Sequence, residues 1–176
     1  RLRGLPAAIT ALSRLTERRV ANNYASRLPR QAWRLPRLRR LCVAGNMLAA
    51  LPELPSSAAV AAGHCASCAA TLTSLDASGN QLAALPASLP RLRGLRALDL
   101  RCNQLRGGPG AAGLERALLP LTRLTALRLD RNHLARLPCL APLRRLEVLS
   151  ASGNHLGPLF ERGGAPGWVS ALPALE

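Results

Sequence analysis

The chain has 176 residues, of which 38 are Leu, 31 are Ala and 24 are Arg, and its 24 basic and 9 acidic residues give a formal net charge of +15. This length is sufficient for one domain with its own core, and a hydrophobic content of 48% excludes a disordered chain. The most apolar stretch, residues 58–62, is far shorter than the roughly 18 residues that a membrane-spanning helix needs.

One eleven-residue pattern, called the repeat frame below, recurs six times along the chain. It has Leu or another apolar residue at its first, fourth and sixth places and Asn at its ninth. The copies occupy residues 15–25, 38–48, 72–82, 95–105, 124–134 and 146–156. The first copy is degenerate, because Arg18 stands at the fourth place where the others have Leu. In each copy the apolar alternation predicts a short strand with two side chains facing a core.

Stacking of these units is expected, because a single unit cannot bury its apolar side by itself. The strands would then form a parallel sheet, and six strands at about 4.8 Å spacing make a sheet roughly 25 Å wide. The ninth-place Asn can bond backbone groups where the chain turns out of each strand, so we interpret it as a buried structural ladder. The ladder residues are Asn23, Asn46, Asn80, Asn103, Asn132 and Asn154.

A Leu-Pro pair runs in phase with the frame at 5–6, 28–29, 51–52, 85–86 and 137–138, and the first three pairs are 23 residues apart. In these residues the chain, from about 5 to 160, resembles the leucine-rich repeat family. Its Leu-Pro pairs resemble the intracellular Ras-suppressor-like class with 23-residue units. The resemblance implies an α/β fold, a right-handed solenoid with short parallel strands on the concave face and an irregular or short-helical convex side. It also implies a role in protein interaction.

We assign residues 1–160 to the repeat array and 161–176 to a C-terminal cap or tail. Two longer units place inserted loops near 56–70 and 106–119, the second with a short helix at 114–119. Insertions in solenoids often carry binding specificity, although a tolerated insertion explains them equally well. The array starts in repeat register without a polar cap, so we interpret the chain as a fragment or as one whose first unit a neighbouring molecule covers.

The Arg-rich first residues pass a crude test for a mitochondrial transit peptide, but their repeat register argues against one. The five cysteines are odd in number and lack paired flanking clusters, which predicts an intracellular protein of the cytoplasm or an organelle, the mitochondrion included, and not a secreted one. His64, Cys65 and Cys68 invite a zinc interpretation, but a closed site needs four ligands. With no catalytic motif and three scattered histidines, we expect no metal, no cofactor and no enzymatic activity.

The residues between the leucines of each strand should point away from the core onto the concave face. This face is polar, and its second half alternates in charge. The candidate partner-binding residues on it are Arg19, Asp76, Asp99, Arg101, Arg128, Asp130 and Arg131. Charge pairing between neighbouring strands explains the same residues equally well.

Positive charge is concentrated near the N-terminus, where residues 1–40 hold eleven Arg and one acid. Most of the candidate basic flank falls in the return segment that follows the Leu-Pro pair at 28–29, on a flank or on the convex side. It comprises Arg27, Arg30, Arg34, Arg37, Arg39 and Arg40. Such a run attracts an acidic partner.

Three functions fit these features. The first is a non-enzymatic protein-interaction scaffold or accessory subunit of a larger intracellular assembly, which binds protein partners with an acidic surface and takes no small-molecule substrate. The alternative is a structural subunit of a ribonucleoprotein such as an organellar ribosome, whose arginines contact RNA phosphates. With only four aromatic residues, base stacking cannot dominate there. The third is a regulatory light chain that binds an acidic protein surface.

Overall fold

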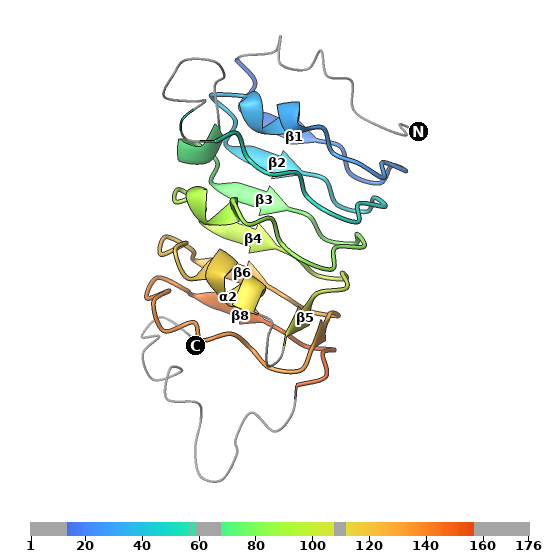
Figure 1. The fold of residues 1–176 in the computed structure, drawn as a ribbon, viewed down its shortest axis with the longest axis vertical. Helices are drawn as coiled ribbons and strands as arrows, with labels where there is room; N and C mark the ends of the chain where they lie inside the picture. Colours follow the sequence, from blue (N-terminus) through green and yellow to red (C-terminus); the bar gives the residue numbers. More distant parts are fainter. Residues whose placement is uncertain (1–13, 57, 59–67, 108–111, 157–176) are drawn as a thin grey trace.

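The protein is described by a computed structural model, which covers residues 14–56, 58, 68–107 and 112–156. Six short strands form one parallel sheet, and the units that carry them stack along one axis (Figure 1). The strands are, in sheet order, β1 (Glu17–Arg19), β2 (Arg40–Cys42), β3 (Ser74–Asp76), β4 (Ala97–Asp99), β6 (Ala126–Arg128) and β8 (Val148–Ser150). Each belongs to one copy of the repeat frame, so the stacked parallel strands predicted from the repeat are confirmed.

Equivalent places of the frame lie opposite each other in the sheet. Leu75 is the Cα partner of Leu41 on one side and of Leu98 on the other. The fourth-place leucines from β2 to β6 are at most 1% exposed and form the centre of the core. A shift of one residue in this register would turn the whole row of leucines toward solvent, and burial therefore fixes the register.

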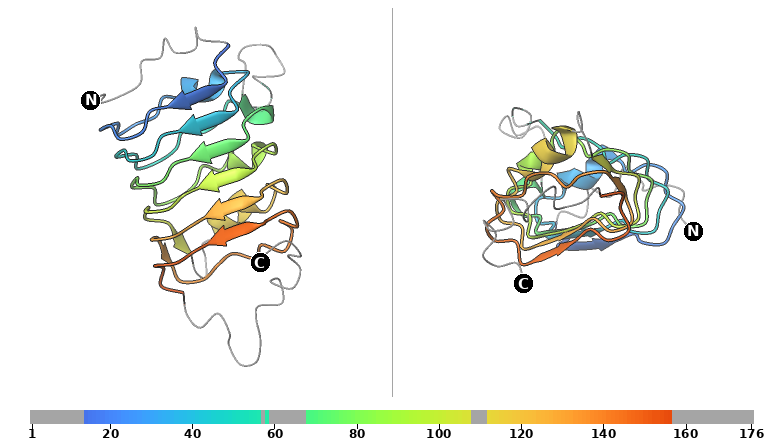
Figure 2. Two further views of the ribbon diagram at one scale, coloured as in Figure 1. Left: turned by 180° about the vertical axis from the view of Figure 1, so that it is seen from behind. Right: turned by 90° about the horizontal axis from the view of Figure 1, so that it is seen from below.

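The side opposite the sheet consists of short helical turns. Among the described residues they include the 3-10 helices η2 (Arg30–Arg34), η3 (Cys68–Ala70) and η4 (Leu89–Arg91) and the α-helix α2 (Ala112–Leu118). Seen along the stacking axis in Figure 2, the sheet and these turns lie on opposite sides of the core. The short-helical convex side and the helix expected near 114–119 are therefore present.

The two predicted insertions are described only in part. In the second, β5 (Arg106–Gly107) pairs with β7 (His133–Leu134) in a separate two-stranded parallel sheet, and α2 follows. Most of the first insertion lies outside the described residues, as do His64 and Cys65. The proposed transit-peptide segment and the tail at 161–176 lie outside them as well.

The ninth-place asparagines tie neighbouring units together through their side chains. Asn103 donates through Nδ2 to the carbonyl oxygens of Leu100 and Ala77, each at 3.0 Å, and its Oδ1 accepts from the backbone N–H of Leu82 at 3.0 Å. Asn46, Asn80 and Asn132 repeat this pattern. In each, Nδ2 donates to a carbonyl oxygen of its own unit and to one of the preceding unit, and Oδ1 accepts from a backbone N–H of the preceding unit. These side chains satisfy buried backbone groups that the turns leave without partners.

Arg18 departs from the leucine row, as its sequence position indicates. It pairs in register with Leu41 and is only 9% exposed. Its Nε and Nη1 are buried and have no hydrogen-bond partner among the described residues. Burial lowers the pKa of the Arg18 guanidinium, because a low-dielectric environment disfavours its charged form.

We expect Arg18→Leu to raise the free energy of unfolding by about 1–2 kcal/mol, because it removes an unbonded buried charge and extends the leucine row. Equilibrium urea denaturation followed by circular dichroism measures the change. Arg19→Leu is the matched control, since Arg19 is exposed and pairs only with Glu17. A less stable Arg18→Leu variant would show that the guanidinium stabilises the first unit.

Candidate functional site

The candidate site is the outer surface of the six-stranded sheet, formed by the third, fifth and seventh places of the frame. The strand register aligns the fifth-place residues across the sheet, where Asp99 is the Cα partner of Asp76 and of Arg128. This is the surface that the sequence predicts as the concave face. From β1 to β8 the aligned fifth-place row is Arg19, Cys42, Asp76, Asp99, Arg128 and Ser150.

Asp99 and Arg101 form a two-pronged ion pair at the centre of this face. Arg101 Nε lies 3.0 Å from both carboxylate oxygens of Asp99, and Arg101 Nη2 lies 2.8 Å from Asp99 Oδ2. Asp99 is 9% exposed, whereas the Arg101 side chain is about half exposed. Hydrogen bonding to Asp99 and its charge raise the pKa of Arg101, and the charges of Asp130 and Asp76 act in the same direction.

Two further aspartates on the face are held by hydroxyl groups. Asp130 accepts hydrogen bonds from the hydroxyls of Ser150 and Ser152 and from the Ser152 backbone N–H at 3.0 Å. Burial alone would raise the pKa of Asp130, but these hydrogen bonds outweigh it and lower the pKa. Asp76 accepts from the Ser78 hydroxyl at 2.7 Å and from the Cys42 thiol at 3.4 Å. Both carboxylates are therefore ordered before any partner arrives.

Arg128 differs from the other arginines of the face, because it makes no ion pair within the described part of the chain. Its register neighbour Asp99 pairs instead with Arg101, which follows β4 in the same unit. Arg19 pairs at 2.7 Å with Glu17, which also lies 3.6 Å from Arg40. Internal pairing thus occupies some of the candidate residues and leaves the partly exposed Arg128 available.

Arg131 lies beside the concave face and not in its rows. It occupies the eighth place of the frame, where the backbone is left-handed, with φ of 52° at Arg131 and 61° at Gly45. At Gly45 a Cβ would lie 2.3 Å from Asn22 Oδ1, so any larger residue there would have to displace the Asn22 side chain. The turn geometry places Arg131 at the end of the strand where the chain leaves the sheet.

The candidate basic flank divides over three surfaces. Arg40 begins β2 and lies on the concave face, because it occupies the third place of the frame. Arg37 and Arg39 precede β2, whereas Arg30 and Arg34 bound η2 on the convex side, with Arg27 shortly before it. The six arginines are all exposed, and the flank as a binding surface stays a prediction.

No family model matches the sequence, but curated relatives do. The chain is 39% identical over 104 residues to a leucine-rich repeat and calponin homology domain-containing protein of Drosophila melanogaster, with 59% of this chain and 12% of that protein covered. It is 35% identical over 181 residues to podocan-like protein 1 of Homo sapiens, with 89% of this chain and 32% of that protein covered. The chain therefore spans less than a third of either relative.

Solved structures agree with the sequence relatives. A leucine-rich repeat protein of Leptospira interrogans matches with a TM-score of 0.51 and 25% identity, over 98% of this chain and 50% of that one. YopM from Yersinia enterocolitica matches with a TM-score of 0.59 and 30% identity, over 81% of this chain and 25% of that one. The fold is a leucine-rich repeat solenoid. The family resemblance seen in the sequence is confirmed at this level, and the Ras-suppressor-like class stays a prediction.

Two histidines that are far apart in the sequence come together on this solenoid. The rings of His133 and His155 stack with centroids 5.7 Å apart, and Nδ1 of the first lies 3.5 Å from Nε2 of the second. Both are exposed and border an open hollow with Arg106. The two histidines are neighbours because each directly follows a ladder Asn in adjacent units. Among the described residues that line the hollow there is no carboxylate.

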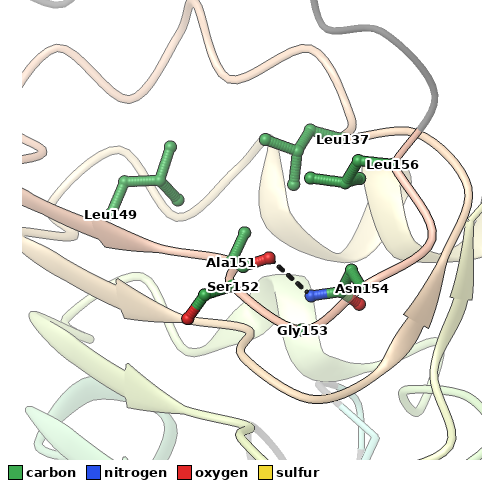
Figure 3. A pocket seen from close by; sticks show the side chains of 7 residues that line it. All are labelled: Leu137, Leu149, Ala151, Ser152, Gly153, Asn154 and Leu156. Carbon is green, nitrogen blue, oxygen red and sulfur yellow. Dashed lines mark hydrogen bonds between the residues drawn. The ribbon is translucent and has the colours of Figure 1, made fainter.

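A second hollow, of about 420 Å³, lies at the C-terminal end of the solenoid (Figure 3). Leu137, Leu149 and Leu156 line it, and Asn154 Nδ2 donates to the Ala151 carbonyl oxygen at 2.8 Å at its edge. Leu149 is the register partner of the fully buried Leu127. The hollow is therefore the end of the described hydrophobic core.

The zinc interpretation gains no support from Cys68. Its side chain is fully buried in η3, and burial raises the pKa of its thiol to about 12. A zinc ligand must be a thiolate, which this environment disfavours. Within the described ranges, no cluster of three or more His, Cys, Asp or Glu is arranged to hold a metal ion.

No helix among the described residues is long and apolar enough to cross a bilayer.

Proposed function

We propose that this leucine-rich repeat solenoid is a non-enzymatic protein-interaction module that binds a polypeptide through its concave face. The observation that carries the proposal is the distribution of charge. All three aspartates of the chain lie on this face, together with Glu17, and four arginines balance them. The rest of the chain holds twenty arginines and five acids. The concave face is thus a balanced polar surface on a strongly basic molecule.

The geometry of this face suits recognition of a partner with alternating charge. Asp99 holds the Arg101 guanidinium in place, and hydroxyl groups hold Asp76 and Asp130, so little side-chain entropy is lost when a partner binds. Arg128 offers a free cation for an acidic side chain of the partner. Ala97 and Ala126 occupy the third places beside it, and their small side chains allow a partner backbone to approach.

The role of an accessory subunit in a larger intracellular assembly is part of the same proposal. An acidic region of the partner would be attracted by the arginines outside the concave face, at long range and in a salt-dependent manner. A ribonucleoprotein subunit, the alternative function, would use those outer arginines and not the residues of the concave face.

A charge swap tests the concave face directly. Asp99→Arg combined with Arg128→Asp reverses two neighbouring charges and leaves the net charge of the chain unchanged. Peptides selected against the wild-type chain from a display library provide the probe. We expect the swap to weaken their binding at least about tenfold, which corresponds to about 1.4 kcal/mol, as measured by isothermal titration calorimetry.

The matched control is Glu115→Arg combined with Arg116→Glu in α2, on the opposite side of the solenoid. It also preserves the net charge, so it should bind the selected peptides like the wild type. Selected peptides that bind both swapped variants equally well would place the interaction site away from the concave face.

A further inference from the structure

Eight of the described arginines outside the concave face lie along one lateral edge of the solenoid. We call this the entry edge, because the chain enters each strand there; it comprises residues 14–16, 36–39, 70–73, 93–96, 122–125 and 144–147. It holds eight arginines and a single acid, Glu147. All eight are exposed. They are Arg14, Arg37, Arg39, Arg93, Arg96, Arg123, Arg144 and Arg145.

Backbone hydrogen bonds align this edge across all six units. The Arg39 N–H donates to the Thr16 carbonyl, the Thr73 N–H donates to the Arg39 carbonyl, and each bond is 2.7–2.8 Å long. The same ladder continues through Arg96 and Thr125 to Glu147. The entry edge is therefore a continuous surface that repeats with the strand spacing of about 4.8 Å. In Figure 1 it runs along the side where the strand arrows begin.

The opposite edge carries almost no charge. It consists of the eighth to tenth places of the frame, at the six turns that contain the ladder asparagines, and it includes one arginine, Arg131, and no acid. The entry edge therefore carries a larger excess of positive charge than the concave face, which is balanced, or the opposite edge. Such an excess attracts a polyanion to this edge.

The middle of the entry edge is hollowed between two arginines. Arg93 and Arg123, from adjacent units, line an open hollow of about 550 Å³ together with Gly94 and Thr122. At Gly94 a Cβ would lie 3.0 Å from the Ala70 carbonyl oxygen, so the glycine lets the neighbouring turn approach closely. Two guanidinium groups at one hollow can donate several hydrogen bonds to a single phosphate.

We propose that the entry edge binds the phosphate backbone of a nucleic-acid duplex, with the hollow between Arg93 and Arg123 as its central phosphate site. Guanidinium groups from five of the six units along this edge match a polyanion that carries many charges. Single-strand binders add aromatic side chains on which bases stack. Among the described residues the entry edge has no aromatic side chain, since Trp33 is buried in η2 and Tyr24 lies on the opposite edge. Such an edge can contact the phosphates of a duplex, but it cannot stack on or read its bases.

The test compares two variants of the full chain that carry the same net charge. The edge variant replaces Arg37, Arg93, Arg96, Arg123 and Arg145 with Gln. The control variant replaces Arg27, Arg30, Arg34, Arg106 and Arg136, which are exposed elsewhere, with Gln. Fluorescence anisotropy with a labelled 20-base-pair RNA duplex, repeated from low to high salt, gives the dissociation constant and its salt dependence.

The edge variant should bind the duplex at least about tenfold more weakly than the control at 0.15 M salt. Each lost phosphate contact should lower the magnitude of the salt slope by about 0.9, which gives a decrease of up to about 4.5 for the five substitutions of the edge variant and less than about 1 for the control. Circular dichroism verifies that both variants are folded. The swap of Asp99 and Arg128 should leave duplex binding unchanged, so the concave-face and entry-edge proposals can fail separately.

Two outcomes would overturn the proposal. Equal weakening in both variants would show that duplex binding depends on net charge and not on the edge. Displacement of the duplex by a 20-residue poly-glutamate peptide at equal charge concentration would identify an acidic polypeptide as the better partner for this surface.

Discussion

Replacing Trp33 with Ala is expected to lower the free energy of unfolding by about 3–5 kcal/mol. Trp33 lies in η2 with none of its surface exposed, and its Nε1–H donates to the Pro52 carbonyl oxygen at 2.7 Å. The side chain therefore packs into the core and also connects the return segments of two adjacent units. Equilibrium urea denaturation followed by far-ultraviolet circular dichroism measures the loss.

Trp33→Phe separates packing from hydrogen bonding. The phenyl ring keeps most of the apolar contact but cannot donate to Pro52, so we expect a loss of about 1–2 kcal/mol. Tyr24→Ala is the surface control, because Tyr24 is 49% exposed, and its loss should stay below about 0.5 kcal/mol. Wild-type stability in Trp33→Ala would mean that η2 does not pack on the core.

The strands were predictable because each place of the frame recurs in the same environment. Six copies of one alternation identify the buried leucines, and the sheet register follows from stacking equal units. Trp33 lies in a return segment whose sequence does not repeat, between Arg30 and Arg34. Trp33 does not occupy a repeating place of the sequence pattern, so the pattern could not identify it as a core residue. Its burial depends on contacts with the next unit.

The candidate site was predictable only as a surface. Alternation places Asp99 and Arg128 on the open face of the sheet, but it does not say which charges pair. Asp99 pairs with Arg101, two residues later in its own unit, and not with Arg128 across the sheet, and this choice depends on side-chain conformations. The entry edge could have been found from the sequence, by aligning the residues just before and after the first Leu of every copy.

Replacing Asn103 with Ala is expected to lower the free energy of unfolding by about 2–4 kcal/mol. The substitution leaves the buried N–H of Leu82 without its acceptor. The carbonyl oxygens of Ala77 and Leu100 each keep one donor, from Asn80 and Asn132, because neighbouring ladder residues share them. The cost therefore comes mainly from one unpaired donor and from the lost connection between two units. Urea denaturation compares the variant with the wild type.

Position in the ladder should set the size of this effect. Asn154 makes equivalent bonds at the last described turn but is only partly buried, so water can replace its side chain, and Asn154→Ala should cost about 1 kcal/mol. Asn103→Asp keeps an acceptor for Leu82, yet it loses the Nδ2 hydrogen bonds and places a carboxylate beside the carbonyl oxygens of Ala77, Leu100 and Arg101, so it should be as unstable as Asn103→Ala. Equal losses at positions 103 and 154 would show that burial does not control the strength of the ladder.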